Sequence, residues 1–329
     1  MKEYIVLKEL KVEVYTIGYE PEGEGIVVKI KVDGSTKFCL VIDCYEIEEN
    51  NKTLEIIKNE KINLICISHP DEDHCKGLEK ILGLATKDTM ILYPSNMLEK
   101  NYKNDSANKV KNKLAEFLSM NKNNLNKPKL RKCIEISDIL PSINFLNSDK
   151  IYKLRIRTYS PVTSFIDRKI GKEILNKKGK IIENNELSIM MSLELGTLKL
   201  LFCGDIENDT IREVNNNVGK EEGDFFSRTI DYVKIPHHGS IGSIEMFELF
   251  SEVNRISNSV TTVYRPSKLP NIETLRRYQE KSSKMFCTSR IKQKENKEDY
   301  GIVQQTFDVI NQTVKTEEYK GNATEIINL

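Results

Sequence analysis

The sequence predicts an α/β protein in which two mixed β-sheets pack face to face and helices cover both outer faces, a four-layer αββα sandwich. Two observations carry this prediction. Apolar, strand-like runs separated by turn-forming residues recur in both halves of the chain, and segments with helical apolar spacing lie between them. No internal repeat of fixed period and no heptad run is present, which excludes solenoids and coiled coils.

The composition indicates a globular protein with one large or two modest domains. The chain has 329 residues, of which 39% are apolar, and single cores stop growing at roughly 250 to 300 residues. Charged residues make up 30% of the sequence but nearly cancel, leaving a net charge of +1. The charge of the whole molecule therefore gives no evidence for a nucleic-acid or membrane partner, and only local patches can do so.

Cysteine usage favours a reducing compartment. The seven cysteines are an odd number, are scattered, and mostly lie in apolar strand-like runs, where a thiol behaves as a small hydrophobe. The N-terminal stretch lacks the uninterrupted apolar core of a signal peptide, and no run approaches the roughly 20 apolar residues that span a bilayer. We therefore expect a cytoplasmic protein without a membrane partner.

The first part of the chain predicts an antiparallel meander followed by strand–helix units. The meander strands are expected at 3–7, 11–17, 25–32 and 37–44, with "EPEGEG" and "VDGS" as turns. Further along, we expect a helix over 53–62, a strand over 62–68, a helix over 77–84 and a strand over 89–94. The strand at 62–68 is continuously apolar, which is typical of a strand buried on both faces.

The remainder predicts one basic helical region and a second set of strands. Val110, Leu114, Phe117 and Leu118 have helical spacing, and a loop is expected over 121–132. Strands are expected at 151–159, 187–195, 197–205, 231–235, 260–264 and 284–288, helices at 244–253 and 272–280, and then a polar tail. Gly196 and Thr197 form the two-residue loop of a hairpin.

The residues that carry chemistry follow these apolar strands. The only four histidines form two clusters, "HPDEDH" with His69 and His74, and "PHHGS" with His237 and His238. A third strand ends in "FCGD", which contributes Asp205. Imidazole and carboxylate are ligands for Zn²⁺ and Mn²⁺, and one carboxylate can bridge two cations. Together with Asp71 and Asp73, these histidines and Asp205 supply enough ligands for two metals. The alternative interpretation of "HPDEDH" is a polar surface loop.

"SHPDEDHCKGL" resembles the signature of the metallo-β-lactamase superfamily, usually H-x-H-x-D-H and here H-x-D-x-D-H. With "FCGDI" and "VKIPHHGS", this variant is similar to the nuclease-like domain of the competence protein ComEC. The resemblance runs from about Val12 to Arg290. It implies a metallo-β-lactamase-like domain over 1–290 with a basic helical insertion at about 97–150, and a C-terminal strand or tail at 291–329 that completes or flanks the domain.

The resemblance also implies roles for individual residues. His69 and Asp71 would bind one metal, Asp73 and His74 the other, and Asp205 would bridge them. One of His237 and His238 would complete the first metal and the other would face the substrate; we assign His237 to the metal and His238 to catalysis. Leu269 occupies the place of a further histidine, which leaves the second metal one ligand short. The carboxylate at 71 favours Mn²⁺, with Zn²⁺ as the other plausible ion.

Several neighbouring residues complete the predicted site. Asp73 would orient the attacking water, and Ser240 would contribute a hydroxyl to the substrate. Asp43 is expected to buttress the metal-binding loop. Asn185 and Ser188 match the hairpin that precedes the aspartate in this family, although an ordinary polar turn explains them equally well.

A metal-dependent phosphodiesterase that cleaves DNA is the function this set of residues favours. The segment from 97 to 132 contains ten basic and three acidic residues. In it, Lys129, Arg131 and Lys132 would contact a polyanion. A solvated face of a lysine-rich protein is the alternative for this segment. A hydrolase of small phosphoesters, cyclic nucleotides or lactones, and a catalytically degraded metal-binding subunit with a protein partner, are the competing functions.

Overall fold

The computed structural model describes residues 7–329, except for 96, 99–100, 122–123, 125, 135, 140–142, 148–149, 164–165, 168–183, 219–224, 292–298 and 328. All but the last residue of the strand predicted at 3–7 lies outside this set. Within the described part of the chain, no helix is both long enough and apolar enough to cross a membrane.

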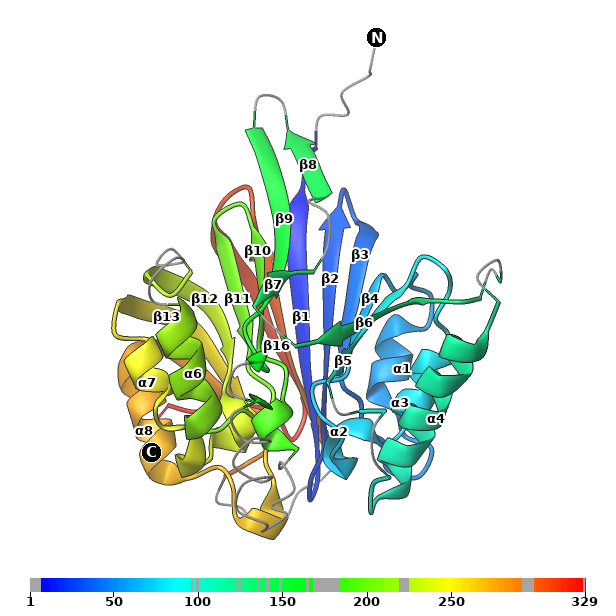
Figure 1. The fold of residues 1–329 in the computed structure, drawn as a ribbon. Helices are drawn as coiled ribbons and strands as arrows, with labels where there is room; N and C mark the ends of the chain where they lie inside the picture. Colours follow the sequence, from blue (N-terminus) through cyan, green and yellow to red (C-terminus); the bar gives the residue numbers. More distant parts are fainter. Residues whose placement is uncertain are drawn as a thin grey trace.

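Eight strands form the first sheet, in which β15 and β16, from the C-terminal part of the chain, lie beside the N-terminal strand β1 (Figure 1). In spatial order they are β16 (Thr313–Gly321), β15 (Tyr300–Asp308), β1 (Leu10–Tyr19), β2 (Glu24–Val32), β3 (Ser35–Ile42), β4 (Leu64–Cys66), β5 (Met90–Pro94) and β6 (Lys129–Cys133). Antiparallel pairing of β1, β2 and β3 confirms the predicted meander. From β3 to β6 the strands run parallel, so their carboxyl ends meet at one edge.

The second sheet has the same mixed character. Its strands, in spatial order, are β17 (Thr324–Glu325), β14 (Ser282–Cys287), β13 (Val253–Thr261), β12 (Arg228–Lys234), β11 (Leu198–Phe202), β10 (Met191–Leu195), β9 (Lys150–Thr158) and β7 (Ser137–Asp138), with β8 (Ile143–Asn147) paired to β9. Gly196 and Thr197 join β10 to β11, as predicted. The strands from β11 to β14 are parallel, so their carboxyl ends also share one edge.

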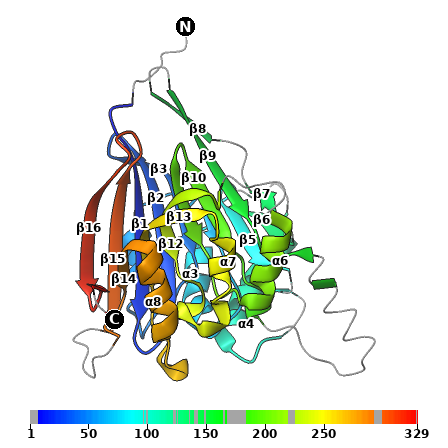
Figure 2. The same cartoon turned by 90° about the vertical axis from the view of Figure 1, so that its left-hand side faces the viewer.

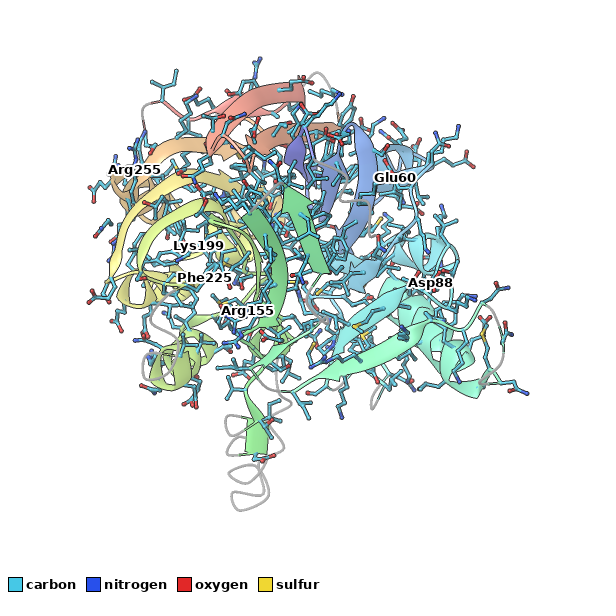
Figure 3. All side chains as sticks on the ribbon, turned by 90° about the horizontal axis from the view of Figure 1, so that it is seen from above. Glu60, Asp88, Arg155, Lys199, Phe225 and Arg255 are labelled. Atoms are coloured by element: carbon cyan, nitrogen blue, oxygen red, sulfur yellow. The ribbon has the colours of Figure 1, made fainter. Side chains whose placement is uncertain are left out.

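Helices cover the outer face of each sheet, which confirms the four-layer αββα sandwich. α1 (Lys52–Ile57), α3 (Leu78–Leu82) and α4 (Asp105–Ser119) lie on the first sheet, and α6 (Asn208–Val218), α7 (Met246–Leu249) and α8 (Ile272–Lys281) lie on the second (Figures 1 and 2). Three apolar clusters separate the layers: one between the sheets, and one under each helical layer. Seen from above, Glu60 and Asp88 lie on the first half, and Lys199, Phe225 and Arg255 on the second (Figure 3).

The basic segment at 97–150 contributes to this frame. α4 begins at the N-cap Asn104, whose side chain accepts a hydrogen bond from the backbone N–H of Ala107. Val110, Leu114 and Phe117 are buried as predicted, but Leu118 is 51% exposed, because the buried stripe of α4 is narrower than the sequence pattern suggested.

Several elements differ from the sequence-based expectation. The loop predicted over 121–132 ends in strand β6, which adds to the edge of the first sheet. Residues 208–218 form α6, a helix that was not predicted, and α7 covers only part of the helix predicted at 244–253. The region at 291–329, expected as a strand or tail, contains three strands: β15 pairs with β1, β16 with β15, and β17 with β14 of the second sheet.

Candidate metal centre

The motif "HPDEDH" lies on the loop that leaves β4, at the edge where the carboxyl ends of the parallel strands meet. Asp71 is the N-cap of α2 (Glu72–Cys75), a single helical turn. That turn lies at the lower end of the molecule in Figure 1, between the two sheets. Asp73 and His74 belong to the turn and are buried. His69 and His74, the two ends of the motif, are both fully buried.

His74 points its Nε2 atom at two carboxylates. The distance from Nε2 is 3.4 Å to Asp73 Oδ2 and 3.5 Å to Asp205 Oδ1. The other ring nitrogen, Nδ1, lies 2.8 Å from Asp43 Oδ2. Since an ionised carboxylate only accepts hydrogen bonds, Nδ1 carries a proton, and Nε2 is the nitrogen left to face Asp73 and Asp205. Asp43 therefore orients the His74 ring.

His69 is oriented in the same way through a hydroxyl. Its Nδ1 lies 2.9 Å from Ser68 Oγ, and that hydroxyl donates to Asp43. Its Nε2 lies 3.5 Å from Asp71 Oδ2 and 3.9 Å from Asp205 Oδ2. One buried carboxylate therefore sets the orientation of both histidines of the motif.

Asp205 arrives from the second sheet through a tight turn after β11. Its backbone N–H donates to Ser188 Oγ at 2.9 Å, so the hairpin serine predicted from the sequence holds the aspartate in place. Gly204 has a φ of +52°, and a Cβ atom there would lie 2.4 Å from Ser188 Oγ. Only glycine fits this turn, because a side chain would collide with the group that positions Asp205.

The two histidines after β12 adopt left-handed backbone conformations that are unusual for residues other than glycine. The φ angles of His237 and His238 are 46° and 50°, and such conformations cost of order 1–3 kcal/mol each. They turn the two rings to different environments. His238 Nε2 lies 3.1 Å from Asp73 Oδ2 and 3.4 Å from Asp205 Oδ2, whereas His237 Nδ1 lies 3.2 Å from Glu207 Oε1.

The charges of this cluster depend strongly on one another. Burial raises the pKa of Asp73 and of Asp205, but the His74 and His238 imidazoles outweigh burial and hold both pKa values well below their usual range. Burial lowers the pKa of His238, and Asp205 and Asp73 outweigh it, raising that pKa to about 9. The lone pairs that attract protons here would equally attract a divalent cation.

Unpartnered ligand atoms support a cation at this position. His69 Nε2, His74 Nε2 and Asp205 Oδ1 are buried and have no hydrogen-bond partner, although buried polar atoms normally have one. One ligand atom each from Asp73, His74, Asp205 and His238 lies within 4.8 Å of the others. The donor set, imidazole nitrogen with carboxylate oxygen, suits Zn²⁺ and Mn²⁺.

A polar cavity of about 170 Å³ opens over the cluster. Its lining residues are Asp71, Asp73, Asn185, Asp205, His237, His238, Tyr264 and Ser267. Asn185 also donates to Glu207 at 3.4 Å. The predicted substrate residue Ser240 caps the short helix η3 (Ile241–Ser243), where its hydroxyl accepts from the N–H of Gly242.

The predicted basic substrate residues are not brought to this cavity. Lys129, Arg131 and Lys132 lie on β6 and are absent from the cavity lining. Arg131 donates to the carbonyl of Ile139 and to Ser137 Oγ, so its guanidinium is engaged locally. Their contact with a substrate stays a prediction, and the geometry does not support it.

Three residues near the site escaped the sequence analysis. Tyr264 stacks on His238 with 5.4 Å between ring centroids. Glu24, in a stretch treated as a turn, and Lys234, within an apolar strand, form an ion pair beneath the cluster with an N–O distance of 2.7 Å. A lysine inside the apolar run "YVKI" was the one signal available, because a charge in a buried strand needs a partner.

No family model matches the chain, and no curated protein matches it. Among solved structures, the long form RNase Z from yeast is 12% identical with a TM-score of 0.43, and the match covers 85% of this chain but only 41% of that chain. A metal-dependent hydrolase of the β-lactamase superfamily is 11% identical with a TM-score of 0.45, covering 84% of this chain and 95% of that one.

A CmlA β-hydroxylase variant is 13% identical with a TM-score of 0.44, and covers 93% of this chain and 55% of that one. None of these TM-scores reaches 0.5, so the similarities decide neither the activity nor the ComEC-like branch. The case for a function rests on the side chains of the site.

Proposed function

We propose that this chain is a metal-dependent hydrolase that holds two divalent cations, Mn²⁺ or Zn²⁺, and cleaves phosphodiester bonds in DNA. One observation carries the metal centre: buried ligand atoms without hydrogen-bond partners converge from both sheets. His69 Nε2 and His74 Nε2 come from the first sheet and Asp205 Oδ1 from the second. A binding surface for proteins or small apolar molecules has no need of such a cluster.

The donors divide into two groups that share Asp205. Asp73, His74, Asp205 and His238 form a four-donor group. His69 Nε2 lies 3.9 Å from Asp205 Oδ2 and 3.5 Å from Asp71 Oδ2, which brings His69 and Asp71 into a second group. His238 thus supplies the imidazole that the sequence lacks at position 269. Leu269 instead exchanges backbone hydrogen bonds with Tyr264. The geometry favours His238 as the metal ligand and His237 as the residue that faces the substrate, which is the reverse of the roles predicted from the sequence.

Bound cations would supply a water molecule of near-neutral pKa and stabilise charge that develops on the substrate. The residues of the chain arrange what surrounds that step. Asp73 faces the cavity and orients the attacking water through its carboxylate. His237, held by Glu207 and 20% exposed, lies in the cavity lining, where it can donate a hydrogen bond to a phosphate oxygen.

The position of α4 supports a nucleic-acid substrate. Asn104 Nδ2 donates to the backbone carbonyl of Pro70 at 3.2 Å, so the start of the basic helix lies against the metal-binding loop. Lys103 and Lys109, near that start, are exposed. Lysines on this side would attract a polyanion toward an otherwise acidic cavity.

Incubation of the purified protein with linear and circular DNA in Mn²⁺ tests the proposal, with Asp73→Ala as the inactive variant. We expect cleavage by the wild type alone. Equal cleavage by the variant, or no cleavage by either, would sink the proposal.

Salt dependence tests the role of α4. Lys103→Ala combined with Lys109→Ala should reduce the slope of log affinity against log salt by up to about 2. Lys37→Ala with Lys58→Ala, two exposed lysines away from α4, is the matched control and should leave the slope unchanged.

A hydrolase of small phosphoesters, cyclic nucleotides or lactones is the second candidate, and the cavity itself favours it. None of the eight lining residues is Lys or Arg, and the volume of about 170 Å³ suits a small substrate. Turnover of a small phosphodiester that is insensitive to salt and to the Lys103 and Lys109 substitutions, without DNA cleavage, would select this alternative.

A metal-binding subunit without turnover, working with a protein partner, is the third candidate. Metal content per chain separates it from the first two. Two equivalents of Mn²⁺ or Zn²⁺ support catalysis, and zero or one equivalent supports the degraded site.

A further inference from the structure

A buried ion pair joins the two sheets directly beneath the candidate metal centre. Glu24 is the first residue of β2 in the first sheet, and Lys234 is the last residue of β12 in the second. Lys234 Nζ lies 2.7 Å from Glu24 Oε2, and the two side chains are 0% and 2% exposed. Burying two charges costs more than a well-packed apolar pair would, so the pair calls for a reason beyond stability.

Glu24 is also connected to the imidazole of His238. The hydroxyl of Thr262 donates to Glu24 Oε2, and Thr262 Oγ1 lies 2.8 Å from His238 Nδ1. The carboxylate itself is 3.4 Å from that nitrogen. Since the hydroxyl proton of Thr262 is committed to the carboxylate, its oxygen accepts the proton of His238 Nδ1. Nε2 is then the nitrogen that faces Asp73 and Asp205, where a cation would replace its proton.

The same arrangement occurs on the first sheet. Asp43 accepts from the hydroxyl of Ser68, and that oxygen lies 2.9 Å from His69 Nδ1. Each of these two histidines therefore has a hydroxyl and then a buried carboxylate behind its ring, and the row that ends in His238 crosses from Glu24 in the first sheet to Thr262 in the second. The difference is that Glu24 faces a lysine, which keeps it an acceptor beneath a cluster of further carboxylates.

We infer that Glu24, Lys234 and Thr262 are positioning residues that fix the tautomer and orientation of the His238 ring for metal binding. The inference rests on the proposed function in one respect, that a cation binds at His238 Nε2. Partners behind a ligating histidine are worth roughly 10- to 100-fold in metal affinity. Lys234 acts through Glu24, and Glu24 acts through Thr262.

Thr262→Val removes the hydroxyl but keeps the shape of the side chain, whereas Thr262→Ser keeps the hydroxyl. We expect Thr262→Val to weaken binding of Mn²⁺, measured by calorimetric titration of the full chain, by 10- to 100-fold. Thr262→Ser should bind within about twofold of the wild type. Equal affinity of the valine variant and the wild type would overturn the inference.

A second variant covers the case in which Thr262→Val does not fold. Glu24→Met combined with Lys234→Met replaces the ion pair by apolar chains of similar volume, so no buried charge is left unpaired. If the pair positions His238, this double variant melts close to the wild type in chelator but loses at least about tenfold in Mn²⁺ affinity. If the ion pair only stabilises the fold, the double variant binds Mn²⁺ with the affinity of the wild type.

Nitrogen-15 spectra of the metal-free protein separate failure of this inference from failure of the proposed function. Only four histidines contribute signals, and at alkaline pH, where the rings are neutral, the chemical shifts report which nitrogen is protonated. We expect His238 to be protonated at Nδ1 in the wild type and to populate both tautomers in Thr262→Val. A wild type that binds no metal refutes the proposed function, and an unchanged tautomer in Thr262→Val refutes the positioning role.

Discussion

At the scale of single residues, the hydrogen bond made by Nδ1 of a histidine determines where its Nε2 atom points. His74 and His69 are both oriented by Asp43, directly and through Ser68, and His238 is oriented by Thr262. Each ring therefore turns its Nε2 atom to the same group of carboxylates. His237 Nδ1 lies beside Glu207 instead, so two adjacent histidines of identical chemistry have different surroundings.

Substitution of the two adjacent histidines tests this difference. His238→Ala should weaken Mn²⁺ binding by at least about tenfold, because it removes one donor of the four-donor group. His237→Ala should leave Mn²⁺ affinity within about threefold and lower the rate of turnover instead. Metal titration and steady-state kinetics on both variants make the comparison, and the reverse pattern would restore the roles predicted from the sequence.

At the scale of elements, the site is built from the ends of parallel strands. β3 and β4 lead to Asp43 and the HPDEDH loop, while β11 and β12 lead to Asp205 and the histidine pair. Parallel strands bring residues that are far apart in sequence to one edge. The turns at these ends are tight, and Gly204 shows why, since its φ of +52° and its contact with Ser188 exclude a side chain.

Gly204→Ala should therefore destabilise the protein more than an ordinary glycine substitution. We expect a loss of about 2–4 kcal/mol, because the added Cβ would meet Ser188 Oγ as well as strain the backbone. Gly34→Ala is the matched control, with a φ of +80° and no atom within 4 Å of the added Cβ, and should cost about 1 kcal/mol. Urea unfolding measures both, and equal losses would contradict the proposed clash.

At the scale of the whole molecule, the candidate metals link the two halves of the sandwich. Asp73 and His74 come from the first sheet, and Asp205 and His238 from the second. The contacts across this edge include the imidazole–carboxylate pairs His74–Asp205 and His238–Asp73 and the Glu24–Lys234 ion pair. A cation shared by both halves would bind the folded state alone and should stabilise it.

Metal addition should therefore raise the melting temperature. At a free Mn²⁺ concentration of about 100 times Kd, one site contributes about 2.7 kcal/mol, which corresponds to a rise of a few degrees for a chain of this size. A chelator should reverse the rise, and Asp205→Asn should abolish most of it. Asp209→Asn, on the exposed face of α6, is the control and should melt like the wild type with and without metal.

The sequence by itself determined the αββα class and most of the candidate donor set, because apolar periodicity and polar residues placed directly after strands are local signals. The antiparallel meander, the Gly196–Thr197 hairpin and the convergence of Asp73, His74 and Asp205 all follow from them. It did not predict α6, whose polar composition conceals a buried stripe, or the pairing of β15 with β1, which lies at the other end of the chain.

Only the tertiary structure decided which of two adjacent histidines faces the carboxylates, since the left-handed turn at His237 and His238 sends the two rings in different directions. It also brought together Glu24 and Lys234, which are 210 positions apart in the numbering. Pairings across the two sheets depend on how the sheets pack, and no local pattern of residues encodes that.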